Sequence, residues 1–307
     1  MLTLPDNWEL ASLLAKLLFY IGAFSIAGGS LCAWRYSNAN KAALRSNFSY
    51  MFFGTVIGFH GALLGFLVQV GLISDSGIVG MFDWGMISIL LDTAQGDVAL
   101  LRMLAFMLAG VSSLFLIKRL PHYDLSLVNP LTRLLFTLQV TALLGLAYSQ
   151  TVVGHVSVLS PVARASIVLH FIAFSLWIGC CYPFLQLSRS LDLEVLQDSL
   201  KRFGNNAIVI LLVLFVAGGL MLLELLGSPL ELLNSAYGQA LSAKLILVLA
   251  ILGVAAMNKL AIVPRLVSSG SAARLQTSLR YEIALAMAIL VVTAYFSTIV
   301  GPASHQM

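Results

Sequence analysis

Eight long apolar runs cover most of the chain, and they leave it few folds to adopt. Each run has about 19 to 25 residues, and about 20 residues of α-helix cross the roughly 30 Å hydrocarbon core of a bilayer. None of the runs alternates apolar and polar residues with the period of two that a spanning strand needs. We therefore predict an all-α polytopic membrane protein, a bundle of eight transmembrane helices over roughly residues 10–34, 50–73, 99–117, 131–149, 164–187, 206–227, 238–262 and 280–300.

Composition supports this class of protein. Of the 307 residues, 60% are hydrophobic and 10% are charged, whereas a soluble domain has about 25% charged residues. The chain has no phosphate-binding loop and no common hydrolase signature, so we expect neither a nucleotide partner nor an enzyme. Its net charge of +4 comes from short loops and does not indicate a nucleic-acid partner. The first ten residues lack a basic leader, so we expect no removed signal peptide.

The basic residues alternate between the loops and so predict the orientation. Thirteen of the 17 fall on one side, which we take as cytoplasmic: Arg35, Lys41, Arg45, Lys118, Arg119, Arg133, Arg189, Lys201, Arg202, Lys259, Arg265, Arg274 and Arg280. Both termini then lie on the opposite side. On that side we expect a short interfacial or re-entrant helix over the bundle, from Phe82 to Ala94. We divide the chain into residues 1–150, with an outer segment at about 74–98, and residues 151–307.

The other four basic residues lie just inside the outer ends of spans: Lys16, Arg102, Arg164 and Lys244. Charges at that depth reach outward to water or pair with acids, and Glu224 is the nearby acid. Two readings stay open. These charges either stabilise the bundle, with a Glu224–Lys244 pair as one option, or they tune the electrostatic field at an outer site.

Histidines within spans need a polar partner, so they mark candidate sites. His155 follows Gly154 at the mouth of the fifth span, and His170 lies six residues inside that span. His60 lies mid-way along the second span, whose glycines predict a central place in the bundle. Met103 and Met107 share one face of the third span. Each of these side chains has a plain structural reading as a packed core residue beside its reading as a ligand.

Three cysteines lie in apolar runs, at Cys32, Cys180 and Cys181, and indicate no disulfide framework. Cys180 and Cys181 lie about 24 Å along the fifth span, near its inner end. Neighbouring residues on a helix point about 100° apart, so both thiols do not readily face one ion. They are either an inner acceptor for a metal ion or core packing. We assign no role to His122, and His305 and Met307 lie in a short outer tail.

The second half of the chain resembles the CopD family of bacterial copper-resistance and copper-import membrane proteins. Matching stretches in family order carry the resemblance: GH at 154–155, ARASIVLHFIAFSLWIG at 163–179, RFGNNAIVILLVLFVAGG at 202–219, SAYGQALSAKLILV at 235–248 and AAMNKLAIVPRL at 255–266. The eight-span layout agrees with the family. Cys180 and Cys181 depart from it, since small residues usually follow the Trp177–Gly179 motif.

The resemblance implies copper transfer into or across the bacterial inner membrane, beside a small periplasmic copper-binding protein. Cu(I), rather than Cu(II), suits imidazole, thioether and thiolate ligands. We predict a copper site or short path of His155, His170 and His60, with Met103 and Met107 completing it and Trp177 closing its floor. Arg102, Arg164, Glu224 and Lys244 would give electrostatic support. Two alternatives stay open: a b-type haem between His60 and His170 in an electron-transfer protein, or histidines that only hold the bundle together.

Overall fold

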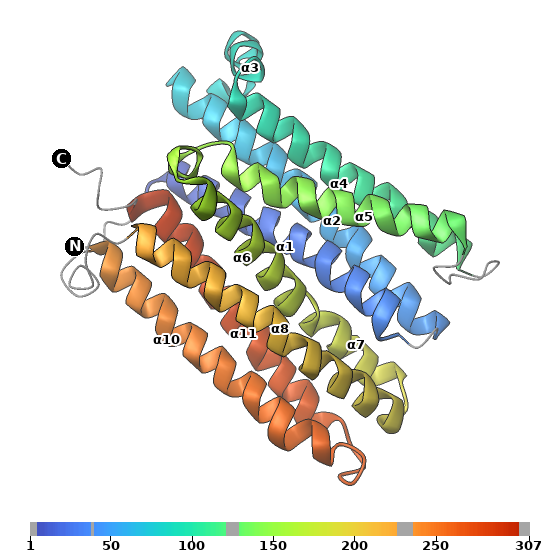
Figure 1. Ribbon diagram of the computed structural model, residues 1–307. Helices are drawn as coiled ribbons and strands as arrows, with labels where there is room; N and C mark the ends of the chain where they lie inside the picture. Colours follow the sequence, from blue (N-terminus) through green and yellow to red (C-terminus); the bar gives the residue numbers. More distant parts are fainter. Residues whose placement is uncertain (1–4, 38–39, 121–128, 226–235, 301–307) are drawn as a thin grey trace.

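The structure is a computed structural model that describes residues 5–37, 40–120, 129–225 and 236–300. These residues form helices and no strand, and eight of the helices are long and apolar enough to cross a membrane. The eight helices lie side by side in one bundle (Figure 1). The predicted all-α polytopic fold with eight spans is therefore confirmed.

The first four spans are α1 (Asn7–Arg35), α2 (Lys41–Ser74), α4 (Ala94–Arg119) and α5 (Pro130–Tyr148). Between α2 and α4 the chain forms the 3₁₀ turn η1 (Gly77–Phe82) and the short helix α3 (Trp84–Leu91). Asp83 caps α3 by accepting bonds from the N–H groups of Gly85 and Met86. The segment predicted to lie over the bundle is thus helical, but it lies only at the ends of α2 and α4 (Figure 1).

The last four spans begin with α6 (Pro161–Gly179) and α7 (Cys181–Ser190), which together form the fifth span. They continue with α8 (Leu193–Leu225) and with α10 (Ala236–Met257), which runs into the π-helical turn η4 (Asn258–Ile262) and the 3₁₀ turn η5 (Val263–Arg265). The final span is α11 (Ala273–Tyr295), extended by the π-helical turn η6 (Phe296–Val300). The 3₁₀ turns η2 (Ser149–Thr151) and η3 (His155–Val158) join α5 to α6.

The fifth span is broken at Cys180 because of the residues around it. Pro183 has no N–H to donate to the carbonyl of Gly179, so the helical ladder cannot continue through this point. Gly179 also lies against the backbone of α1 at Gly28, where a Cβ on either glycine would overlap the other residue. The backbones of α1 and α6 therefore approach each other directly at this level of the bundle.

Helix α1 holds the centre of the bundle. It packs against α2, α5, α6, α7 and α11. The prediction that the glycine-rich second span is central is wrong, because α2 leaves Phe53 and Val56 exposed. Its glycines instead serve a close contact with α1: Gly54 lies on Ser25, and Gly58 lies on Gly22 and on Phe106 of α4.

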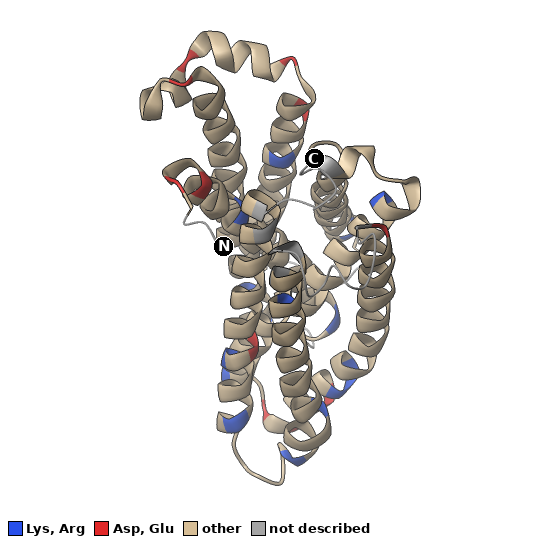
Figure 2. Cartoon of the chain, turned by 90° about the vertical axis from the view of Figure 1, so that its left-hand side faces the viewer, with Lys and Arg blue, Asp and Glu red and all other residues tan. Residues whose placement is uncertain are grey.

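Charged residues divide between the two ends of the bundle. Figure 2 shows most Lys and Arg at one end and most Asp and Glu near the other. Several helices extend past the apolar runs at the basic end: α2 begins at Lys41, α8 at Leu193 and α11 at Ala273. Hydropathy marks the part of a helix inside the hydrocarbon, not the turns that continue into water. Basic residues predicted in loops therefore lie on helices, as Arg45 and Lys201 do.

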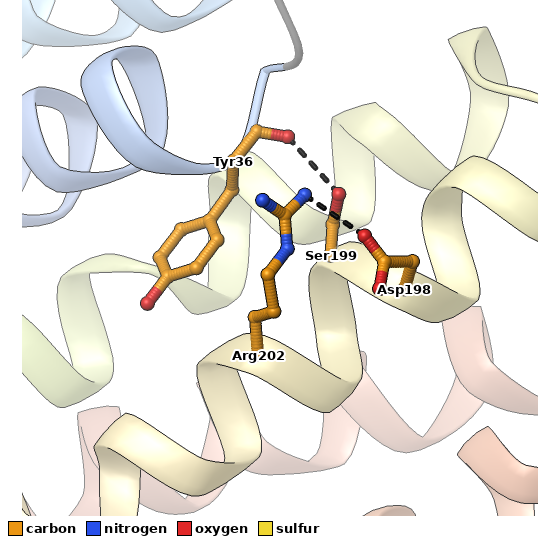
Figure 3. A network of polar contacts seen from close by, with 4 residues as sticks. All are labelled: Tyr36, Asp198, Ser199 and Arg202. Carbon is orange, nitrogen blue, oxygen red and sulfur yellow. Dashed lines mark hydrogen bonds and ion pairs between the residues drawn. The ribbon is translucent and has the colours of Figure 1, made fainter.

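The end of α1 is fastened to α8 at the basic end (Figure 3). The Ser199 hydroxyl donates to the main-chain oxygen of Tyr36 at 3.2 Å, and the Asn206 amide donates to the Tyr36 phenol oxygen at 2.8 Å. Beside them Arg202 forms an ion pair with Asp198 at 3.1 Å. Tyr36 is fully buried, and its removal from water raises the pKa of the phenol.

Candidate functional site

His170 lies at the contact between α6 and α8. Ser160 and Pro161 start α6 as an N-cap and a first-turn proline, and His170 lies half-buried farther along the helix. The His170 Nδ1 atom lies 3.2 Å from the carbonyl oxygen of Leu214 on α8. A carbonyl oxygen only accepts, so this contact assigns a proton to Nδ1, and in the neutral ring Nε2 then keeps its lone pair. This is the arrangement that orients a neutral imidazole as a metal ligand.

Gly218 makes room for the His170 ring. A Cβ at position 218 would lie 3.2 Å from both Nδ1 and Cε1 of the ring, which is tighter than ordinary van der Waals contact. Gly219, the next residue, has no other atom within 4 Å of its Cβ position. The first glycine of this pair therefore shapes the histidine pocket, and the second does not.

A cavity of about 380 Å³ lies between the fifth span and α8, α10 and α11. Trp177 lines it, as does Leu211, one turn of α8 from the carbonyl that His170 contacts. Most of its wall is apolar. The polar side chains in the wall are Cys181, Asn258, Lys259 and Glu282.

Three polar groups of this inner cavity, those of Cys181, Asn258 and Glu282, are hydrogen-bonded together, and Lys259 is bonded separately to α8. The Cys181 thiol donates to Glu282 Oε2 at 3.4 Å, and the Asn258 amide donates to Glu282 Oε1 at 2.7 Å. The Lys259 ammonium donates to the Gly204 carbonyl at 2.6 Å and to Asn205 Oδ1 at 3.2 Å. Glu282 is only 6% exposed. A carboxylate, a thiol and an amide thus meet inside the membrane-spanning part of the chain.

Cys180 faces different surroundings from Cys181. The Cys180 Sγ atom lies 3.8 Å from the carbonyl oxygen of Gly28, and Cys180 packs with Cys32 in one buried apolar cluster. All three cysteines are free and buried. The two neighbouring thiols point toward different partners, as the geometry of a helix requires.

The structure does not bring His60, Met103 and Met107 to His170. His60 is exposed on α2, and its Nδ1 atom is bonded to the Val56 carbonyl of its own helix at 2.7 Å. Met107 is 49% exposed on α4, whereas Met103 packs into the core. Helix α1 packs against both α2 and α6 and lies between them (Figure 1). His60 is bonded within α2, and His170 faces Leu214 of α8. No observation therefore favours a haem between the two rings.

The remaining predicted histidines fall largely outside the described residues. The backbone of His155 forms the first residue of η3, but its side chain lies outside the described part. His122, His305 and Met307 lie outside the described residues altogether. Among the side chains that the structure describes, no group of three or more His, Cys, Asp or Glu is arranged to hold a metal ion.

The predicted electrostatic residues have separate environments. Glu224 accepts bonds from the Ser160 N–H at 2.9 Å and from the Ser160 hydroxyl at 2.7 Å, so it fastens the start of α6 to α8. It forms no ion pair with Lys244. Arg164 is exposed. Arg102 donates to the Ser149 hydroxyl at 2.8 Å and lies 4.7 Å from the centre of the Phe19 ring.

Sequence reasoning missed Glu282 and Asn258. The predicted start of the last span, at residue 280, placed Glu282 at a helix end, whereas α11 begins at Ala273 and carries this residue inside the bundle. Asn258 stood in one of the motifs at 255–266, but nothing in the motif said what it contacts. The sequence did offer one signal for Glu282, because an acidic residue within an apolar run often marks a functional site.

These observations define a polytopic α-helical membrane protein with titratable side chains inside its helix bundle. Residues 197–296 match the CopD family model, described as copper resistance protein D. This matched third of the chain, which covers most of α8 and all of α10 and α11, is therefore similar to the CopD family. The matched range includes Gly218, Asn258 and Glu282. It begins after His170 and Cys181, so neither of these residues is part of the match. No curated protein and no solved structure matches the chain.

Proposed function

We propose that this protein binds copper as Cu(I) at a site centred on His170 and moves it into or across the bacterial inner membrane. The observation that carries the proposal is the bond from His170 Nδ1 to Leu214, which leaves Nε2 free to coordinate. Cu(I) is a soft ion that needs only two or three ligands. The similarity of residues 197–296 to a copper-resistance family suggests the metal, and His170 is the first ligand in this proposal.

His155 is the second ligand in this proposal. It follows Gly154, whose φ of 74° turns the chain at the start of η3. Gly154 also lines the outer cavity of the bundle. His60, Met103 and Met107 are left out of the site, because the first and last of these are exposed and Met103 packs in the core.

Cys181 is the inner acceptor in this proposal. His170 and Trp177 are seven residues apart and so share nearly one face of α6, and Trp177 and Cys181 both line the inner cavity. By helical rise, His170 and Cys181 are about 16 Å apart along the span. Binding of Cu(I) by Cys181 replaces the thiol proton with the metal, and the Glu282 carboxylate at 3.4 Å accepts that proton. Cys180 has no part in this step, since it faces Gly28.

Orientation completes the proposal. The basic end of the bundle faces the cytoplasm, because Lys and Arg concentrate there (Figure 2). His170 then lies in the periplasmic half and Cys181 in the cytoplasmic half. Lys16 and Arg102 line the outer cavity and repel a free cation, so a periplasmic copper-binding protein is the fitting donor.

The binding experiment compares two histidine variants. Purified protein is titrated with Cu(I) against a competing chelator, and the bound copper is also counted by elemental analysis. We expect His170→Ala to lower the affinity at least about tenfold, because it removes a ligand. His60→Ala is the matched control and leaves the affinity unchanged. Equal affinity in the native protein and in a His155→Ala/His170→Ala double variant contradicts the proposal.

A further inference from the structure

A second and larger cavity, of about 640 Å³, lies beside the first half of α1, toward the end of the bundle opposite to Arg35. Its wall is formed by the outer parts of α1, α2 and α4, by η6 and by the connection from η2 through η3 to α6, with single residues from α6 and α8. It shares no lining residue with the inner cavity that contains Cys181. His170 does not line it either.

Two cationic side chains, Lys16 and Arg102, line this outer cavity, and no carboxylate does. The Lys16 ammonium donates to the Ser297 carbonyl and hydroxyl at 3.2 and 3.0 Å and to the Thr298 hydroxyl at 2.7 Å. The Arg102 guanidinium donates to Ser149. Among the described residues, neither cation has an acidic partner within 4.0 Å. Arg102 also lies 4.7 Å from the centre of the Phe19 ring, but no anionic side chain neutralises either cation among the described residues.

Spare hydrogen-bond donors accompany these charges. A guanidinium has five N–H groups, and Arg102 uses its Nε and one Nη2 group on Ser149. The Nε2 atom of Gln150, another lining residue, is buried and has no hydrogen-bond partner. A buried amide donor without a partner costs stability unless a ligand supplies an acceptor. The polar side of the cavity therefore offers positive charge and unused donors from α1, α4 and η2.

We propose that the outer cavity is an anion site that binds a phosphate group. Two uncompensated cations in a membrane-embedded cavity repel each other and are costly to bury, and an anion between them removes both costs. Arginine and amide donors from several directions suit the tetrahedral oxygens of phosphate. The phosphate comes either from free phosphate or from the headgroup of an anionic phospholipid, whose acyl chain suits the apolar wall at Phe66, Ile167 and Met221.

The test uses full-length protein without copper, so its outcome is independent of the copper proposal. One arm measures the Tm in detergent with inorganic phosphate against chloride at equal ionic strength. The second arm measures lipids retained in native mass spectrometry after reconstitution into phosphatidylglycerol or phosphatidylcholine nanodiscs. The variants are Arg102→Gln and Lys16→Gln. If one of them does not fold, the other still tests the proposal. The control is Arg45→Gln, an exposed charge at the opposite end.

We expect native protein and the control to bind phosphate or to retain phosphatidylglycerol selectively. Each cavity variant weakens that binding by about tenfold, as the loss of one charge-assisted hydrogen bond predicts. Stabilisation by inorganic phosphate identifies a free anion, and selective retention of phosphatidylglycerol alone identifies a lipid headgroup. The proposal is overturned if neither ligand binds, or if both cavity variants bind as native protein does.

Discussion

The Cys181 thiol donates a hydrogen bond to the carboxylate of Glu282 across 3.4 Å, and this bond joins the fifth and eighth spans. Asn258 of the seventh span holds the other carboxylate oxygen at 2.7 Å. Three spans thus contribute to one polar cluster at the floor of the inner cavity. A thiolate is a soft ligand, and a thiol must lose its proton to bind a metal, so the neighbouring carboxylate fits the proposed acceptor role of Cys181.

The first prediction concerns this cluster. Cys181→Ala removes the thiol, and Glu282→Gln removes the proton acceptor while keeping the shape of the side chain. We expect either change to slow Cu(I) transfer through the protein by at least about tenfold, because a ligand or its supporting group is lost. The measurement is the rate of copper movement across reconstituted vesicles. Cys180→Ala is the matched control and keeps the native rate; if Cys181→Ala keeps it too, the acceptor role is refuted.

The second prediction concerns the pocket of the His170 ring. Gly218→Val places a branched side chain where a Cβ alone already lies 3.2 Å from the ring. We expect the bond to Leu214 to break and Cu(I) affinity to fall by about tenfold, as for other groups that orient a ligating histidine. Gly219→Val adds the same side chain into open space and leaves affinity as it was. Chelator competition measures the Cu(I) affinity of both variants. Equal affinities would show that the space left by Gly218 does not position the His170 ring.

The third prediction concerns the packing of α1 on α6. Gly179→Ala forces a methyl group into the backbone of α1 at Phe24 and Gly28. Overpacking of this kind costs about 1–3 kcal/mol of stability, and we expect a clear fall in Tm. Gly253→Ala provides the control, since its Cβ position has no other atom within 4 Å. Equal melting temperatures for the two variants would show that the contact between Gly179 and α1 can accommodate a methyl group.

The fourth prediction concerns Tyr36 at alkaline pH. Burial raises the pKa of this phenol above its ordinary value of 10.0. Its contribution to stability is therefore complete below pH 10 and is lost as the pH rises through the folded-state pKa, because the unfolded chain ionises more readily. Tyr36→Phe loses the bond from Asn206, at a cost of about 1 kcal/mol near pH 7.

The readout for Tyr36 is the Tm between pH 7 and pH 11. We expect the difference between native protein and Tyr36→Phe to narrow above pH 10, because only the native protein has this phenol to ionise. A constant difference over the whole range would show that the buried phenol does not contribute to the alkaline loss of stability.

The fold was more predictable from sequence than the site. Eight apolar runs located the spans because the bilayer sets both their length and their polarity. The runs did not reveal where helices continue beyond the hydrocarbon, and so the early start of α11 and the burial of Glu282 were missed.

Contacts between distant spans were not predictable from pattern alone. The sequence marks His170 as a polar ring inside a span, but its partner Leu214 contributes only a backbone carbonyl, which no side-chain pattern indicates. His60 has the same signal in sequence and lies exposed on α2. Which face of a helix meets a neighbour depends on packing, and glycines such as Gly28 and Gly179 set that packing only as a pair.

The most direct test of the central claim is Cu(I) uptake into sealed proteoliposomes that contain a trapped Cu(I)-binding dye. The protein should carry copper to the dye, and His170→Ala should reduce the rate by about tenfold or more. His60→Ala, an exposed position on α2, should keep the rate within about twofold of native. Native uptake by His170→Ala, with copper still reaching the dye through the protein, would contradict the account.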